Sequence, residues 1–270
     1  MQIYPINKSS NNYNFNKIKR PNPYNTNFGH HPDFVEWQKS CDIMASTYFR
    51  RGRYYDSASK NFIDVISTLK LFFDKNKNKK VTMLIGGVAD SQECYSDLAV
   101  IKSLIGKKKI DSVLDLYTID LQSKPDEKTL ILQSFCDGKH PKYVPECFVR
   151  ENTFKYGNGK FRKYKVKPDI YQYLASVYNN PEKASWETRI QEKIKAYPDN
   201  TFDIISVNNT LIYFYYHKTM MDTLNEIQKK LKPGGVFITD PHKIDYQEVF
   251  SPDICNEIYD GIYQKIFKCN

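Results

Sequence analysis

Apolar residues recur at three- and four-residue steps between Asp33 and Phe73, a spacing that places them on one face of a helix. This pattern predicts an N-terminal helical extension over residues 33–75. The stretch before it, residues 1–32, is rich in Asn, has no hydrophobic period and is expected to form a flexible arm. The apolar face of the extension consists of Phe62, Val65, Ile66, Leu69, Phe72 and Phe73.

From residue 76 onward the pattern changes, because short apolar runs now alternate with helical segments. A helix is expected at 95–105, and a second one ends at LKPGG, where Gly234 and Gly235 suit a left-handed C-cap. Such alternation favours an α/β fold, with a mostly parallel sheet that helices cover on both faces. Buried strands are expected at 81–87, 112–120, 202–207 and 236–240.

A long insert, residues 121–201, separates the second and third expected strands. Its middle is β-rich and alternates around a Gly157-Asn158-Gly159 turn, which predicts a β-hairpin within about 140–170. We therefore expect one domain over residues 76–270 that contains the sheet and carries this hairpin in its insert.

Composition places the chain of 270 residues among globular proteins that can bury a sizeable core. Its 40 Lys and Arg against 31 Asp and Glu give a net charge of +9. This charge permits nucleic acid, an acidic protein surface or an anionic cofactor as a partner. The lysine runs flank predicted elements, as solvated loops do, so nucleic acid is not the favoured partner.

The cysteine and hydropathy patterns exclude further classes. Six scattered cysteines form no CxxC pair, and no Cys/His group has zinc spacing, so no metal site is expected. No stretch approaches the ~20 apolar residues of a membrane span, and the first residues lack the pattern of a secretory signal. A cytoplasmic protein with reduced thiols is therefore expected.

Three expected strands end in residues suited to ligand binding, and in open α/β sheets ligands bind at the carboxyl ends of strands. Gly86 and Gly87 let the backbone turn and approach a ligand closely. Asp120 follows the second strand, where a carboxylate can accept hydrogen bonds from a ribose diol. Asn208 and Asn209 follow the third, and buried amides need polar partners.

Together these strand ends indicate a nucleoside-binding site. The chain contains neither the GxGxxG dinucleotide fingerprint nor the GxxxxGK[ST] phosphate loop, which disfavours NAD and ATP. S-adenosylmethionine, with S-adenosylhomocysteine as its product, remains the leading cofactor. Each feature also has a purely structural interpretation: a tight turn, a solvated Asp, and core aromatics for Tyr213 and Phe214.

The order of these motifs resembles that of the CheR-type family, the S-adenosylmethionine-dependent methyltransferases that esterify glutamate on bacterial chemoreceptors. The resemblance extends over about residues 45–240. Residues 86–96, GGVADSQECYS, stand in the place of the family's first motif, roughly A-G-C-S-T-G-E-E-P-Y-S. Ser91 replaces the interior Gly and Cys94 the Pro, whereas the matching residues are Glu93, Tyr95 and Ser96.

Further motifs extend the resemblance. NNTLIYF, residues 208–214, is similar to the family's R-N-V-x-I-Y-F, with Asn208 in place of Arg, and Thr118-Ile119-Asp120 is similar to the end of S-D-I-D. Tyr164-Lys165-Val166-Lys167-Pro168 resembles Y-x-V-x-P of the family's insert, and Asn179 falls near its adenine-contacting Asn. TYFRR, residues 47–51, resembles T-x-F-F-R, whose Arg lies near methyl donor and acceptor.

As a divergent member of this family, the chain is expected to have a Rossmann-like class I methyltransferase fold and to methylate a protein carboxylate. Arg51, with Arg50 a close second, and Tyr213 would then be catalytic. Two alternatives stay open: another acceptor such as RNA, protein or a small molecule, and an inactive fold that serves as an interaction module. The resemblance implies cofactor contacts from Gly86, Gly87, Glu93, Asp120, Asn179, Asn208 and Asn209.

Overall fold

The computed structural model describes a part of the chain that belongs to one compact unit, Cys41–Asn270. The predicted arm, most of the helical extension, and Arg51, Asn209 and Tyr213 lie outside the described residues. The domain boundaries expected from the sequence therefore stay a prediction. The described residues are 65, 68–76, 79–88, 91–133, 135–137, 153–156, 163–208, 210–211, 214, 216–239, 249–259 and 261–266.

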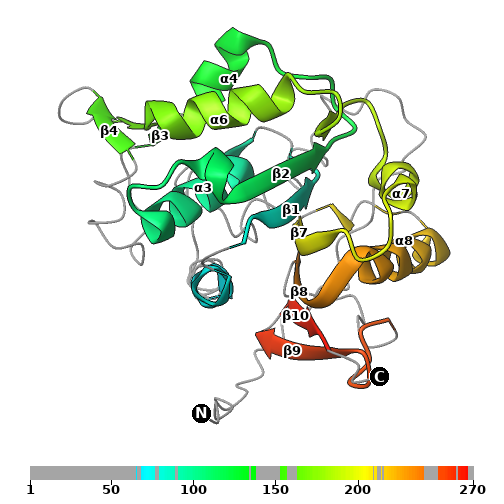
Figure 1. Ribbon diagram of the computed structural model, residues 1–270. Helices are drawn as coiled ribbons and strands as arrows, with labels where there is room; N and C mark the ends of the chain where they lie inside the picture. Colours follow the sequence, from blue (N-terminus) through cyan, green and yellow to red (C-terminus); the bar gives the residue numbers. More distant parts are fainter. Residues whose placement is uncertain are drawn as a thin grey trace, which may run out of the picture. The chain divides into compact units, whose positions relative to one another are not determined.

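A seven-stranded sheet forms the centre of this part (Figure 1). The first five strands in spatial order are parallel, and β10 is antiparallel to both of its neighbours. The mostly parallel α/β sheet expected from the sequence is thus confirmed. In spatial order the strands are β6 (Ala184–Ser185), β2 (Leu114–Ile119), β1 (Val81–Gly86), β7 (Phe202–Val207), β8 (Leu231–Thr239), β10 (Ile262–Lys265) and β9 (Cys255–Tyr259).

The direction in which the chain adds strands reverses at β1. From β1 the chain builds β2 and β6 on one side, then returns to add β7 and β8 on the other. A crevice for ligands opens at such a switch point, outside the carboxyl ends of the strands. The ends of β1, β2 and β7 are therefore where a site is expected.

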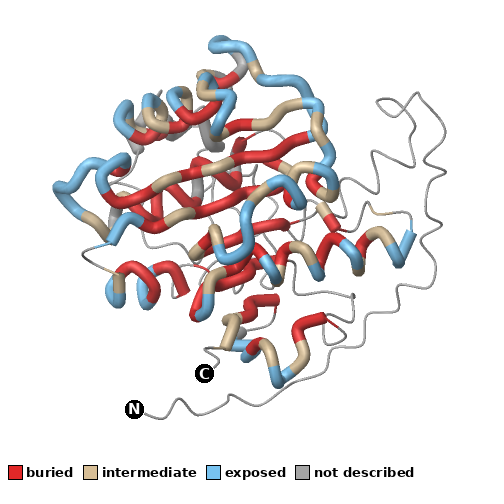
Figure 2. Tube along the Cα trace, turned by 45° about the vertical axis from the view of Figure 1, so that its right-hand side comes forward, coloured by how far each residue is buried: buried red, intermediate tan, exposed pale blue. Residues whose placement is uncertain are grey.

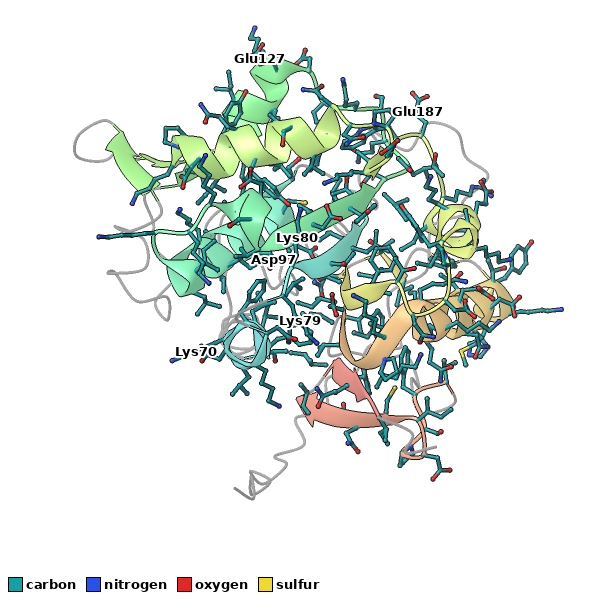
Figure 3. The ribbon with its side chains drawn as sticks, viewed as in Figure 1. Lys70, Lys79, Lys80, Asp97, Glu127 and Glu187 are labelled. Carbon is teal, nitrogen blue, oxygen red and sulfur yellow. The ribbon has the colours of Figure 1, made fainter. Side chains whose placement is uncertain are left out.

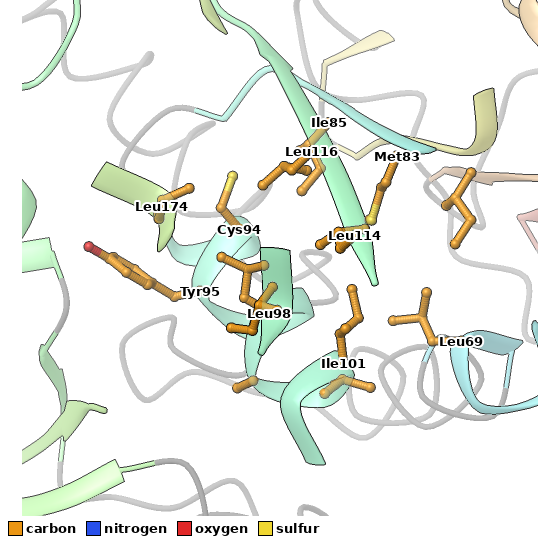
Figure 4. Close-up of a cluster of buried hydrophobic side chains, with 14 of the residues drawn as sticks. Leu69, Met83, Ile85, Cys94, Tyr95, Leu98, Ile101, Leu114, Leu116 and Leu174 are labelled. Carbon is orange, nitrogen blue, oxygen red and sulfur yellow. The ribbon is translucent and has the colours of Figure 1, made fainter. Parts of the chain in front are cut away.

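Helices cover both faces of the sheet because residues within each central strand alternate between two cores. Met83 and Ile85 of β1 face the core beneath α3 (Gln92–Ile105) and α6 (Pro168–Tyr178), as Figure 4 shows in part. Leu84 faces the other core, beneath α7 (Ile190–Lys193) and α8 (His217–Lys230). Figure 2 shows the buried strands between these layers.

The N-terminal helical pattern is confirmed only where the structure describes it. Residues 68–75 are helical, and Leu69 is fully buried in the core that α3 and α6 share. The short 3-10 helices η1 (Ile110–Ser112) and η3 (Ile194–Ala196) lead toward β2 and β7 respectively.

The insert carries a small antiparallel sheet of its own. Within it β4 (Thr153–Tyr156) pairs with β5 (Lys163–Val166), which confirms the predicted hairpin, although its glycine turn lies outside the described residues. β3 (Phe135–Asp137), which follows α4 (Glu127–Gln133), adds a third strand beside β5.

The predicted helix cap at LKPGG is wrong. Helix α8 ends at Lys230, and Leu231 is already extended with ψ 132°, so all five residues of LKPGG belong to β8. A Cβ on Gly235 would lie 2.9 Å from the carbonyl oxygen of Lys232 and 3.0 Å from that of Asp203. Glycine is needed there because the backbone of β7 approaches closely, at a register irregularity, rather than to cap a helix.

Candidate functional site

The first wall of the candidate site is the glycine turn that follows β1. Gly87 has φ +76°, and its N–H donates to the Ile119 carbonyl at 2.8 Å, which ties the turn to the end of β2. A Cβ on Gly86 would overlap the δ-methyl of Ile190, and one on Gly87 would overlap the hydroxyl of Thr210. The turn therefore needs both glycines. Because neither has a side chain, only backbone atoms of the turn lie at the switch point, where a ligand can approach them closely.

The second wall is the loop that follows β2. The Asp120 side chain is 5% exposed, and its Oδ1 accepts a hydrogen bond from the Gln122 N–H at 2.6 Å. The main chain of Asp120 is also hydrogen-bonded. Its N–H donates to the Ser185 carbonyl oxygen at 2.9 Å, and its carbonyl oxygen accepts from the Thr188 N–H at 3.0 Å. The carboxylate is thus fixed at the end of β2, beside the glycine turn.

The third wall is the end of β7, which a buried carboxylate organises. Oε1 of Glu93, in the first turn of α3, accepts hydrogen bonds from Ser206 Oγ and Asn208 Nδ2, both at 2.7 Å. The single hydroxyl proton of Thr210 is shared between the carbonyl oxygens of Asn208 at 3.1 Å and Gly86 at 3.3 Å. Glu93 therefore links α3 to Asn208, and Thr210 links Asn208 to the glycine turn.

Asp97, one helical turn after Glu93, is a second buried carboxyl group, and its pKa is shifted. Its side chain is 4% exposed, and Figure 3 shows it within the molecule, while the exposed Glu127 and Glu187 point outward at the rim. Burial, and to a smaller extent the charge of Glu93, raises the pKa of Asp97 well above its ordinary value. The start of α3 thus contains two buried carboxyl groups, and their proximity contributes to the raised pKa of Asp97.

The substitution Asp97→Asn is expected to raise the free energy of unfolding relative to the unaltered protein as the pH rises above 3.8, with no gain below that pH. The unfolded chain ionises Asp97 near its ordinary pKa, whereas the folded chain keeps the proton to higher pH. Stability present at low pH is therefore lost as the pH rises through the folded pKa. Urea unfolding at several pH values measures this, with Asp253→Asn, an exposed site, as control. A gain independent of pH would contradict it.

The structure brings together four of the residues that the sequence singled out: Gly86, Gly87, Glu93 and Asn208 form one connected group, with Asp120 at the neighbouring strand end. Asn179 is not part of this connected group. It is exposed at the end of α6, and its Oδ1 accepts a hydrogen bond from Lys124 Nζ at 3.0 Å, in the loop after β2. The roles of all these side chains toward a cofactor stay predictions.

Sequence reasoning missed Trp186, which directly follows the edge strand β6. Trp186 is half-buried, and its neighbours Glu187 and Thr188 donate backbone hydrogen bonds to the carbonyls of Gln122 and Asp120, each at 3.0 Å. Recognition of β6 in the sequence would have placed an aromatic residue at a fourth strand end. It also missed Ser206, whose spacing of two from Asn208 puts both side chains on one face of β7.

The site fits a nucleoside cofactor by the chemistry of its groups. Close backbone at the glycine turn, a carboxylate at the next strand end and a buried amide supply the donors and acceptors that a nucleoside needs. In the part of the chain that the structure describes, no group of three or more His, Cys, Asp or Glu side chains is placed to hold a metal ion. Each helix among the described residues is too short or too polar to cross a membrane.

The described elements form a Rossmann-like α/β fold around a mostly parallel sheet, as the sequence predicted. A family model described as "Methyltransferase domain" matches residues 163–239, from β5 through β8. The match covers less than a third of the chain, and within that segment it supports the methyltransferase domain that the sequence predicted. No curated protein sequence matches the chain.

Several solved methyltransferase structures are similar to the chain. DszA carbon methyltransferase is 14% identical with a TM-score of 0.38, and the match covers 68% of this chain but 35% of DszA. The plantazolicin methyltransferase BpumL, in complex with S-adenosylhomocysteine, is 13% identical with a TM-score of 0.37, over 78% of this chain and 54% of BpumL. N-methyltransferase NodS from Bradyrhizobium japonicum is 12% identical with a TM-score of 0.37, and the match covers 77% of this chain and 98% of NodS.

Proposed function

We propose that the chain is an active, cytoplasmic S-adenosylmethionine-dependent methyltransferase that methylates a protein carboxylate, with a glutamate side chain as the acceptor. The observation that supports the cofactor most directly is the convergence of Gly87, Asp120 and Asn208 on one switch point of the sheet. The acceptor rests on the resemblance of residues 47–51 and 208–214 to the CheR-type family.

Each wall of the site has a task in this proposal. Asp120 accepts hydrogen bonds from the two ribose hydroxyls, and the Gly86-Gly87 backbone lies against the amino-acid end of the cofactor. Asn208 and Asn209 supply amide contacts, and Asn179 contacts the adenine, as the resemblance implies. When bound, S-adenosylmethionine supplies an electrophilic methyl group on a sulfonium.

A carboxylate acceptor suits a site without a general base. Glutamate is ionised at neutral pH, so its oxygen is already a nucleophile. The protein has to align that oxygen and remove its water. We assign the alignment to Arg51, through charge-assisted hydrogen bonds, and the shape of the pocket to Tyr213, because of their places in the family motifs.

Residues 208–214 disfavour the main alternative acceptor. An amine or ring nitrogen usually needs a clamp of the Asn/Asp-Pro-Pro-Tyr type, whose amide or carboxylate accepts its hydrogen bond. Residues 208–214, NNTLIYF, contain no proline. A nitrogen acceptor therefore lacks its expected clamp, which favours the carboxylate over an amine or a ring nitrogen.

Incubation with methyl-tritiated S-adenosylmethionine and a set of glutamate-containing peptides is expected to give label that mild base releases as methanol. Methyl esters hydrolyse in base, whereas methyl groups on nitrogen or aromatic carbon do not. Arg51→Ala is expected to lower this signal about 10-fold or more and to leave the affinity for S-adenosylhomocysteine unchanged. Arg53→Ala, two residues further along the chain, is the matched control. Label that is only base-stable would contradict a carboxylate acceptor.

A further inference from the structure

The hydroxyl of Tyr178, the last residue of α6, reaches the turn between β1 and α3. It donates a hydrogen bond to Ser91 Oγ at 2.8 Å and lies 3.6 Å from Cys94 Sγ. The exposed fractions of the three residues are 3% for Tyr178 and 0% for Ser91 and Cys94. Because water does not reach this contact, the hydrogen bond fixes the separation between α6 and the turn.

Ser91 needs such support because of its backbone. It has φ 64° and ψ 6°, a left-handed conformation that disfavours any residue with a Cβ. From this conformation its N–H donates to Val88 at 2.7 Å, and its carbonyl accepts from Tyr95 at 3.0 Å, which starts α3. Glycine would adopt the turn without help, whereas serine is held in it by the hydrogen bond from Tyr178.

The same tyrosine also contacts the loop after β6. The Tyr178 ring packs edge-on against the Trp186 ring, with ring centroids 4.7 Å apart and ring planes at 84°. The indole N–H of Trp186 donates to the Tyr178 carbonyl oxygen at 3.5 Å. Trp186 belongs to the loop whose backbone is hydrogen-bonded to Asp120 and Gln122. Tyr178 therefore contacts both the turn between β1 and α3 and the loop after β6, which borders Asp120.

We propose that Tyr178 is a positioning residue for nucleoside binding, which holds the glycine turn through Ser91 and the loop after β6 through Trp186. The inference rests on the proposed function, since it concerns the same site. Tyr178 is buried, and it acts on the site through these two neighbours. The chain thus fixes, with a serine and a tyrosine, a turn for which the CheR-type motif has glycine.

Tyr178→Phe, which removes only the hydroxyl, is expected to weaken the binding of S-adenosylhomocysteine about 5- to 10-fold, the effect of one lost buried hydrogen bond. Ser91→Ala, which keeps the Cβ and removes the acceptor, is expected to do the same. The double variant Tyr178→Phe/Ser91→Gly is expected to return to within about twofold of the unaltered protein, because glycine adopts the turn unaided. Calorimetric titration measures all three.

Tyr173→Phe is the matched control on the same helix. The Tyr173 hydroxyl donates to the Leu114 carbonyl at 2.9 Å and accepts from the Leu116 N–H at 3.2 Å, away from the glycine turn. Its loss is expected to lower the melting temperature and to leave the dissociation constant unchanged. A folded Tyr178→Phe protein with unchanged affinity, or a double variant that recovers none of it, would overturn the proposal.

Tryptophan emission tests the connection without any ligand. The chain has two tryptophans, Trp37 and Trp186, so a Trp37→Phe background reports on Trp186 alone. In that background Ser91→Ala is expected to shift the emission maximum of Trp186, and Tyr173→Phe is not. If the unaltered protein binds no S-adenosylhomocysteine, the proposed function fails. The emission shift still tests whether Tyr178 connects Ser91 to Trp186, and an unchanged spectrum in Ser91→Ala would overturn that connection.

Discussion

Asp120→Ala is expected to weaken the binding of S-adenosylhomocysteine by at least about 100-fold. In the proposed site the carboxylate accepts hydrogen bonds from both ribose hydroxyls, and each bond to a charged acceptor contributes about 1.5–3 kcal/mol. The loss of two such bonds corresponds to two or more powers of ten in the dissociation constant. Calorimetric titration of the purified protein measures it directly.

Two variants separate this effect from a general loss of structure. Asp120→Asn keeps a carbonyl oxygen for the Gln122 N–H, a bond of 2.6 Å in the structure, and is expected to bind with intermediate affinity. Asp115→Ala removes a carboxylate from the same strand, near its start, where it is paired with Lys183. That control is expected to bind normally. Unchanged binding by a folded Asp120→Ala protein would place the ribose elsewhere.

Gly87→Ala is expected to lower the free energy of unfolding by about 3 kcal/mol and to abolish cofactor binding. Its φ of +76° costs an alanine about 1–2 kcal/mol. The new methyl group would also overlap the Thr210 hydroxyl and lie 3.0 Å from the Thr210 Cβ, and such overpacking costs about 1–3 kcal/mol. Denaturant unfolding measures the sum.

Gly106→Ala isolates the backbone part of that cost. Gly106 has a similar φ, +60°, but a Cβ there would meet nothing within 4 Å. This variant is expected to lose only about 1–2 kcal/mol, and Gly87→Ala/Thr210→Ala is expected to recover part of the packing loss. Equal destabilisation by the two glycine substitutions would show that Thr210 does not confine the turn.

The central strands could be predicted because a buried strand consists largely of consecutive apolar residues. β1, β2 and β7 are each six residues long and largely buried, so each appears as a short apolar run. The edge strands gave no such signal. β6 has only two residues, and β9 includes the exposed Asn256 and Glu257. Edge strands need fewer apolar residues, and pattern alone does not separate them from loops.

The same distinction applies to the site. Gly86, Gly87, Asp120 and Asn208 were predictable because each follows an apolar run, and parallel strands present their ends at one edge. The supporting contacts were not predictable. Glu93 and Ser206 are 113 residues apart, and Ser91 and Tyr178 are 87 apart. Such pairs depend on how helices pack on the sheet, which no local spacing records.

The late arrival of β7 has a consequence for synthesis on the ribosome. β1 lies between β2 and β7, and the Thr82 N–H donates to the Asp203 carboxylate, 121 residues later, at 2.8 Å. A nascent chain that has emerged only as far as β6 therefore exposes one edge of its central strand, open to wrong pairing. The folding of this domain is accordingly coupled to the synthesis of residues 202–207, and a chaperone that shields β1 until then would raise the yield.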